Sequence, residues 1–191
     1  MNRLSSLALP ILLLIVLALP GAANGAEVPE QSGYVSDYAE IIDAKTEIAL
    51  ALILGTMEEK YGNRLVILTV ESTAPLDIEG YSVEVFREWD LGRDDLLFLV
   101  ALQDGKVRLD AGRRLNKLLT DEKLGEIMEQ EIMPPFSEGD FSQGILRGTV
   151  ALTSAIKEIR KREAQRQTRM TWITIGLIAI AAVALLLVLR S

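Results

Sequence analysis

The chain has 191 residues, with 20 Lys and Arg against 27 Asp and Glu, and therefore a formal net charge of −7. It contains no Cys and no His, which excludes disulfides, thiolate or Ser-His-Asp nucleophiles and His-ligated zinc. Any bound metal is therefore expected to be a hard cation on oxygen ligands, Ca²⁺ or Mg²⁺.

The first 25 residues have the order of charge, apolar core and small residues that is typical of a secretory signal peptide. Arg3 precedes an apolar run over residues 7–19, and Ala23 and Gly25 are small residues suited to a cleavage site. The alternative is that residues 4–19 remain as an uncleaved membrane helix. Both interpretations place the middle of the chain outside the cytoplasm.

The middle of the chain, residues 27–156, is acidic, with about twice as many Asp and Glu as Lys and Arg. No nucleic-acid partner is expected, because such a body would have to overcome phosphate repulsion. Divalent cations and basic partners are better candidates. The alternative is that most of these carboxylates only keep an exported domain soluble.

Helix and strand alternate in the first half of this segment. Asp43 is a suitable N-cap for a helix that reaches Tyr61 and ends at Gly62. Residues 64–71 form a nearly continuous apolar run, typical of a central strand buried on both faces. A second helix is expected over residues 78–89.

A hairpin and two helices follow. Residues 96–102 form another buried strand, and Asp104-Gly105 predicts a turn into a strand over 106–110. Thr120 predicts the N-cap of a helix that Pro134-Pro135 ends. This order of elements predicts a mixed sheet with helices on both faces.

The last helix is expected to begin at the capping box formed by Asp140 and Gln143. Nothing breaks its periodicity before Trp172, so we expect it to continue through a basic juxtamembrane stalk, residues 159–169. A disordered linker is the alternative. Residues 170–189 carry no charge and match the roughly 30 Å core of a bilayer, which predicts a transmembrane helix.

The expected topology is a single-pass protein of the cell membrane, with its globular domain, residues 27–158, on the extracytoplasmic (periplasmic) side. The basic stalk argues against this, because basic flanks usually stay in the cytoplasm. An N-terminal export signal is expected to dominate. The stalk would then contact lipid headgroups or the acidic surface of a partner.

Several segments resemble the TPM domain family, which includes thylakoid lumen proteins of photosystem II repair and membrane-anchored exported bacterial proteins. They are residues 34–39, 62–72, 86–92, 107–112, 119–121 and 132–145. The resemblance covers residues 33–158 and implies a three-layer α/β/α sandwich around a small mixed sheet. It also implies the order of signal peptide, exported domain and membrane helix.

The family resemblance leaves two functions open. The first is an interaction or assembly module for an envelope membrane protein, without catalysis. The second is a divalent-metal-dependent acid phosphatase-like enzyme. Its cation would be held by four carboxylates and its phosphate by one of two arginines: Asp37, Asp94, Asp95 and Asp121, and Arg113 or Arg114.

The first function is favoured, because paired aspartates in a turn and adjacent arginines are common on solvated surfaces. The chain also departs from the family pattern at residues 92–95 and 112–116. These are the loops where the family's ion or substrate site is expected.

Overall fold

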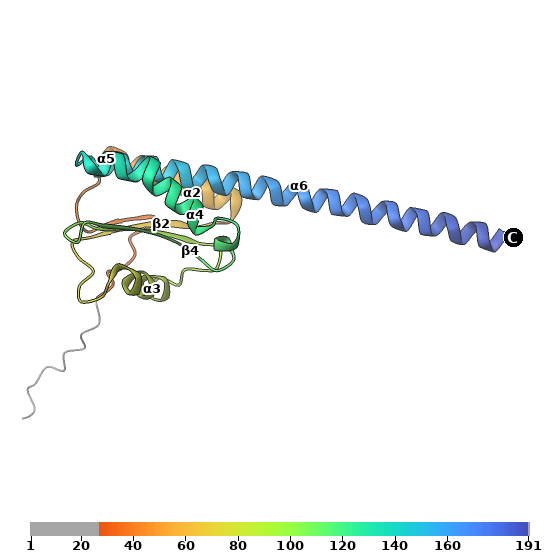
Figure 1. Ribbon diagram of the computed structural model, residues 1–191, viewed down its shortest axis with the longest axis horizontal. Helices are drawn as coiled ribbons and strands as arrows, with labels where there is room; N and C mark the ends of the chain where they lie inside the picture. Colours follow the sequence, from red (N-terminus) through yellow and green to blue (C-terminus); the bar gives the residue numbers. More distant parts are fainter. Residues whose placement is uncertain (1–26, 191) are drawn as a thin grey trace, which may run out of the picture.

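A four-stranded sheet lies between helices on both of its faces in the computed structural model, which describes residues 27–190 and the side chains up to residue 178 (Figure 1). The α/β fold with a small mixed sheet is therefore confirmed. In chain order the elements are β1 (Val35–Asp37), α2 (Ala44–Tyr61), β2 (Leu65–Val70), α3 (Ile78–Glu88), β3 (Leu96–Ala101), β4 (Lys106–Ala111), η1 (Leu115–Lys117), α4 (Asp121–Ile127), η2 (Met128–Ile132), α5 (Met133–Ser137) and α6 (Phe141–Arg190).

The strands follow one another across the sheet in the order β1-β2-β3-β4. The first three are parallel, and β4 returns antiparallel to β3 through the hairpin that Asp104-Gly105 predicts. Every residue of β2 and β3 is buried. A central strand without an exposed residue requires an apolar layer on each face, which the helices provide.

Alternation along the strands divides the core in two. Ile67 and Phe98 face a cluster with α2 and α6, whereas Leu68 and Leu99 face a smaller one with Tyr81 of α3. Both parallel connections advance in the same direction across the sheet, yet α2 and α3 cover opposite faces. The two crossovers therefore have opposite hands, a departure from the strong right-handed preference.

The predicted helices α2 and α3 are confirmed. The Asp43 carboxylate accepts hydrogen bonds from the backbone N–H groups of Lys45 and Thr46, and Gly62 ends α2 at a φ of 68°. Asp77 caps α3 in the same way through the N–H of Gly80.

The expectation that Pro134-Pro135 ends the helix after Thr120 is wrong. The helix α4 passes into the π-helical turn η2, and the prolines then lie in the first turn of α5. A proline costs little there, because N–H groups in a first turn have no partner within the helix. The change of helical pitch in η2 accommodates the prolines.

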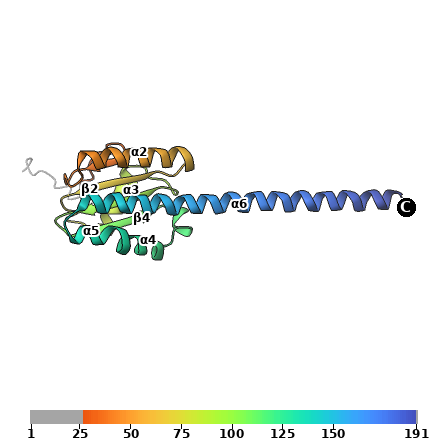
Figure 2. The same cartoon turned by 90° about the horizontal axis from the view of Figure 1, so that it is seen from above.

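The last helix, α6, runs without interruption from Phe141 to Arg190, so the stalk is helical (Figure 2). Asp140 caps it by accepting from the N–H of Gln143. Its N-terminal half lies over the sheet, with α2 on one side and α4 and α5 on the other, and the remainder projects beyond the domain. Gly148 permits this close contact, since a Cβ there would lie 3.0 Å from Phe98.

Two sequence-based predictions lie partly or wholly outside the described residues. The predicted signal peptide, residues 1–25, precedes the described part of the chain. Residues 170–189 belong to α6, but the side chains of 179–189 are not among those described. A search of the described residues finds no helix both long and apolar enough to cross a membrane.

The turn between β3 and β4 is tied to the loop after β2 by one carboxylate. Asp104 accepts hydrogen bonds from the Thr73 N–H at 2.9 Å, the Ser72 hydroxyl at 2.8 Å and the Thr73 hydroxyl at 3.0 Å. These donors, the Thr73 N–H foremost, hold the pKa of Asp104 below its usual value.

We expect Asp104→Asn to lower the melting temperature of the full chain at neutral pH. A depressed folded-state pKa stabilises the protein above the unfolded pKa of about 4, and this contribution is lost as the pH falls through the folded value. The difference in melting temperature between wild type and variant should therefore narrow below about pH 4. Thermal unfolding followed by circular dichroism at several pH values measures this difference. A gap that stays constant with pH would contradict this account.

Candidate functional site

Two loops meet at the end of the sheet where β3 begins. The first precedes β3 and the second follows β4, and the Gly112 N–H donates to the Asp95 carbonyl at 2.8 Å. The N–H of Arg114 donates to the Arg93 carbonyl at 2.9 Å. A Cβ on Gly112 would lie 2.3 Å from the Gly92 carbonyl oxygen, so only glycine allows the loops to approach this closely.

Asp94 and Asp95 both lie in this loop pair, and arginines neutralise both. Asp95 bonds the N–H of Gly92 at 2.7 Å and the Arg64 guanidinium at 3.2 Å. The Oδ2 atom of Asp94 lies 3.3 Å from Nη1 of Arg114, and its Oδ1 atom lies 3.3 Å from Nη2 of Arg160. The two carboxylates therefore hold the loops and α6 together. Because Arg114 pairs with Asp94, it does not stand free to bind a phosphate.

Arg160 connects α6 to the first loop. Its Nε donates to the Oδ1 of Asn63 at 2.8 Å, while another of its nitrogens pairs with Glu163 at 2.7 Å. Asn63 is fully buried and donates in turn to the Asp94 carbonyl at 2.7 Å. The sequence suggested a headgroup contact for Arg160. The structure instead places it in this network, with 17% of its side chain exposed.

Asp37 lies at the opposite end of the sheet from Asp94 and Asp95. It is the last residue of β1, opposite Thr69 of β2, which is itself opposite Val100 of β3. Asp95 precedes the other end of β3, about 16 Å away along the strand. The Asp37 carboxylate instead accepts from the N–H groups of Ile41 and Ile42 and from the Thr69 hydroxyl.

The structure does not bring the four carboxylates of the predicted cation site together. Asp121 is exposed in the first turn of α4, where its charge is favourable at the positive end of the helix dipole, and among the described residues it shares no ion-pair partner with Asp94 or Asp95. No group of three or more His, Cys, Asp or Glu suited to a metal occurs within the described part of the chain.

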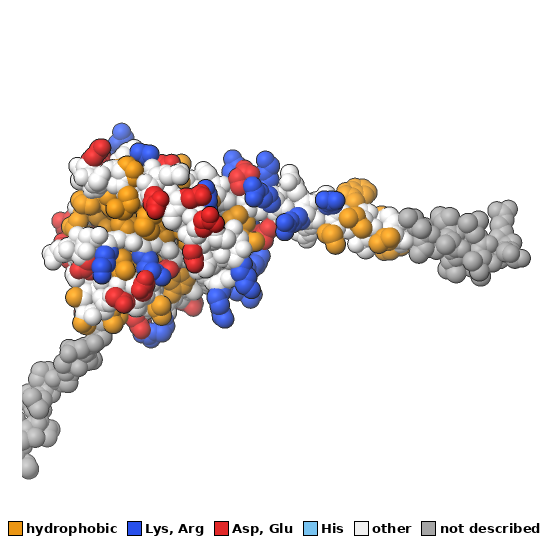
Figure 3. All heavy atoms as spheres, viewed as in Figure 1, with side chains coloured by type: hydrophobic (Ala, Val, Ile, Leu, Met, Phe, Trp, Pro, Cys, Tyr) orange, Lys and Arg blue, Asp and Glu red, His pale blue; other side chains and the backbone are white. Residues whose placement is uncertain are grey.

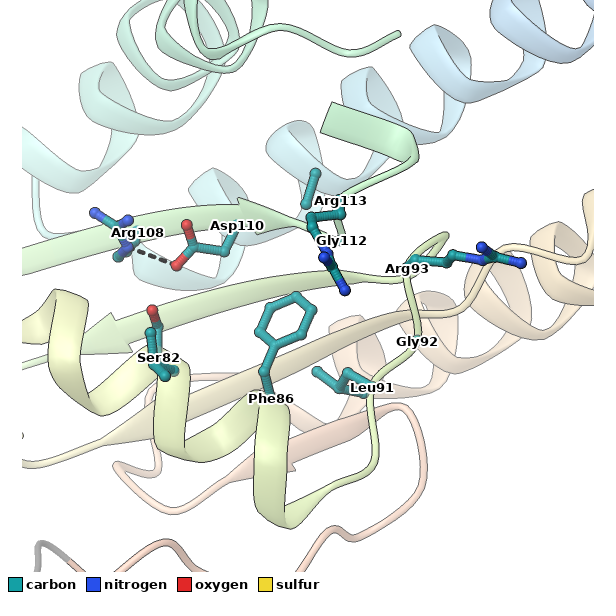
Figure 4. A pocket seen from close by; sticks show the side chains of 11 residues that line it. Ser82, Phe86, Leu91, Gly92, Arg93, Arg108, Asp110, Gly112 and Arg113 are labelled. Carbon is teal, nitrogen blue, oxygen red and sulfur yellow. Dashed lines mark hydrogen bonds and ion pairs between the residues drawn. The ribbon is translucent and has the colours of Figure 1, made fainter. Parts of the chain in front are cut away.

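A pocket of about 350 Å³ opens beside the loop pair, between α3 and β4 (Figure 4). Its α3 wall includes Val83, which is 65% exposed, and Phe86. Its β4 wall includes Arg108, which pairs with Asp110 at 2.5 Å and with Glu79 of α3 at 3.1 Å. The pocket thus combines an apolar wall with a charged one.

Two further arginines, Arg93 and Arg113, line the pocket at the loop end. Figure 4 shows Arg113 reaching toward Phe86, whereas Arg93 points away from the pocket. Neither makes an ion pair within residues 27–178, in contrast to Arg108. Arg113 therefore offers an uncompensated positive charge next to apolar surface, in a domain that is acidic as a whole.

Figure 3 shows further Lys and Arg gathered around the point where α6 leaves the domain, while Asp and Glu are spread over the body. The Arg160–Asp94 contact places the loop pair at this same end. The loop end of the pocket and the root of the projecting helix therefore lie at the same end of the sheet, although α3 and α6 cover opposite faces.

Sequence reasoning identified Arg113 but not the pocket or the network behind it. Asn63, Arg64 and Arg160 carry that network, and none forms a recognisable motif. One signal was available, since Asn63 lies two residues before the buried strand β2 and a buried Asn must satisfy its amide. The partner on α6, 97 residues later, has no such signal.

The fold and site define a class of protein, namely an α/β/α domain with a basic pocket at one sheet end and a long C-terminal helix. The TPM domain model matches residues 35–155, which is more than half of the chain. The chain belongs to the TPM domain family. None of the curated proteins matches its sequence.

Solved structures agree on the fold. The N-terminal domain of a Porphyromonas gingivalis protein is 21% identical, with a TM-score of 0.64 over 68% of this chain and 85% of that chain. The BA42 protein of the psychrophilic bacterium Bizionia argentinensis is 19% identical, with a TM-score of 0.55 over 63% and 84%. A Corynebacterium glutamicum N-terminal domain is 16% identical, with a TM-score of 0.54 over 69% and 85%.

We expect Gly112→Ala to destabilise the protein by about 1–3 kcal/mol, because the added methyl group forces the two loops apart. Gly125→Ala is the matched control, since a Cβ at that position in α4 meets nothing within 4 Å. It should be neutral or stabilising by up to about 1 kcal/mol. Chemical unfolding of the full chain measures both, and equal effects would contradict the close contact.

Arg160→Gln should lower the free energy of unfolding by about 1–3 kcal/mol, because it leaves the buried Asn63 oxygen without its donor. Lys161→Gln is the control, since Lys161 is exposed and has no ion pair among the described residues. It should change stability by less than about 0.5 kcal/mol. An Arg160→Gln variant with an unchanged free energy of unfolding would show that the network does not contribute to stability.

Proposed function

We propose that this TPM domain is an interaction or assembly module, held at the outer face of the cell membrane, that binds a segment of an envelope membrane protein in the pocket between α3 and β4. The observation that carries the proposal is Arg113, an arginine without an ion-pair partner in the described residues that extends over an apolar wall. Arginine beside exposed apolar side chains is typical of protein-binding surfaces.

The sequence supports the membrane anchor. Residues 170–189 carry no charge and are long enough as a helix to cross a bilayer. The N-terminal 25 residues support export of the domain. The basic residues 161–169 would then lie near anionic headgroups, where each is worth about 1 kcal/mol.

The anchor would place the pocket close to the bilayer. Arg160 contacts the loop pair, and residue 170 lies about 15 Å further along α6 at 1.5 Å per residue. A partner segment that reaches this pocket is therefore one that emerges from the membrane nearby. An acidic domain surface, repelled by anionic lipids, would face away from the bilayer.

A photo-crosslinking amino acid tests the proposal when it replaces Val83 in the full chain in native membranes. Val83 lines the pocket and is 65% exposed, whereas Ile48 on α2 is equally exposed at 65% on the other face of the sheet. We expect one discrete adduct with an envelope membrane protein from position 83 and none from position 48, because only the first position borders the pocket.

Identical adducts from both positions, or none from position 83, would refute the interaction function. Turnover of a phosphomonoester by the purified chain, lost in Asp95→Asn but not in Asp121→Asn, would instead support the phosphatase-like alternative. The two outcomes are independent, so crosslinking in native membranes and turnover by the purified variants together distinguish the two functions.

A further inference from the structure

We infer that β4 binds its partner by strand addition: an extended peptide segment pairs with the outer edge of β4 and places an acidic side chain on Arg113. This inference rests on the proposed interaction function and specifies the chemistry of the partner. It follows from the hydrogen-bonding phase of β4, the cavities that flank this strand and the charge at its end.

The phase of the β3–β4 ladder determines which backbone groups of β4 face outward. Ala111 lies opposite Leu96, so Gly112 lies opposite Asp95, and the Gly112 N–H donates to the Asp95 carbonyl. Antiparallel strands alternate between hydrogen-bonded and non-hydrogen-bonded pairs. The N–H and C=O groups of Val107, Leu109 and Ala111 therefore point away from β3.

These outward groups have no hydrogen-bond partner among the described residues, since β4 is the last strand of the sheet. The other edge strand, β1, has three residues, whereas β4 has six. An unpaired edge of this length is a template for another strand. Its donors and acceptors supply affinity, and specificity must come from the side chains on either face.

The two faces of β4 offer different pockets to an added strand. On the α3 face is the pocket with Val83, Phe86 and Arg113. On the opposite face, a cavity of about 260 Å³ lies between the β3–β4 hairpin and α5, lined by Val107 and by Met133, which is 43% exposed. Because side chains of a strand alternate between faces, a bound peptide would reach both.

Charge selects the peptide. On the α3 face, Arg113 lacks an ion-pair partner in the described residues, whereas Asp110 already pairs with Arg108. On the opposite face of β4, the cavity between the β3–β4 hairpin and α5 is mainly apolar. The preferred segment therefore has large apolar residues at every second position and a Glu or Asp in the alternate set.

A second copy of the chain is the less favourable occupant. An antiparallel pair of β4 strands would be related by a two-fold axis perpendicular to the strands. Since α6 runs along the sheet, that axis would make the two helices project in opposite directions (Figures 1 and 2). Two such copies could not share one membrane through residues 170–189, so a partner segment fits better.

The test uses the full chain in detergent micelles and a capped peptide of repeating Thr-Ile-Glu-Ile sequence. We expect the peptide to protect the amides of Val107, Leu109 and Ala111 from hydrogen exchange. The amides of Arg108 and Asp110 are the internal control, because β3 already protects them. The same peptide N-methylated on alternate residues should not bind, because it cannot complete the ladder.

The charge requirement has a matched pair of variants. Arg113→Gln should weaken binding of the Glu peptide about tenfold, and should leave binding of a Gln version of the peptide unchanged. Arg93→Gln removes the same charge from the neighbouring loop, but from a side chain that points away from the pocket, and should change affinity less than about twofold.

The inference is overturned if the three outward amides stay unprotected at saturating peptide, or if a Lys version of the peptide binds as tightly. Protection that rises with protein concentration in the absence of peptide would assign the edge to a second copy, and would also overturn it. A specific crosslink from position 83 without protection of β4 would preserve the interaction function and remove strand addition alone.

Discussion

The complete burial of β2 and β3 is the constraint on which the rest of this structure depends. The six paired positions of β2 and β3 bury all twelve residues of the two strands, and the one polar side chain among them, Thr69, donates its hydroxyl hydrogen to Asp37 at the end of the sheet. Polar chemistry is therefore confined to the strand ends and to the two edge strands. Covering both faces also explains why the crossovers to α2 and α3 have opposite hands, since each face needs a helix and the sheet has few strands.

Because charge is confined to the strand ends, Asp94 and Asp95 bind neighbouring arginines and have a structural role. Asp95 lies between a backbone amide and Arg64, and Asp94 lies between Arg114 and Arg160, so each carboxylate already has the charge-assisted partners that a cation would otherwise supply. The adjacent glycines bring the loops so close that these pairs form between chain segments far apart in sequence. The loop pair is thus a structural junction. The charged group beside it that has no ion-pair partner among the described residues is Arg113.

Patterns that depend on neighbouring residues were predictable from sequence, and those that depend on strand direction were not. The bounds of β2, β3 and α3 follow from apolar runs and caps, and the hairpin follows from Asp104-Gly105. The three-residue strand β1 is too short to show a pattern. The structure does not group Asp37 with Asp95, because β1 and β3 are parallel, so the last residue of β1 and the residue before β3 lie at opposite ends of the sheet. The π-helical turn η2, which lets the chain pass its two prolines, has no sequence signal either.

The direction of β4 relates its edge to the projecting helix. This strand runs from the hairpin toward the loop pair, and the loop pair contacts α6 where the helix leaves the domain. If α6 continues into a bilayer, the Ala111 end of β4 is the membrane-proximal end and the hairpin is the distal one. A segment that emerges from the same membrane would reach Arg113 first and then extend along β4 toward the cavity beside Met133. The contacts of Arg160 with Asn63 and Asp94 attach α6 to the loop pair, and in a membrane-anchored chain they would fix the height of this edge above the bilayer, which a flexible linker would not do. On the proposed function, the length of α6 and the position of Arg113 would together favour partner segments that lie close to the bilayer.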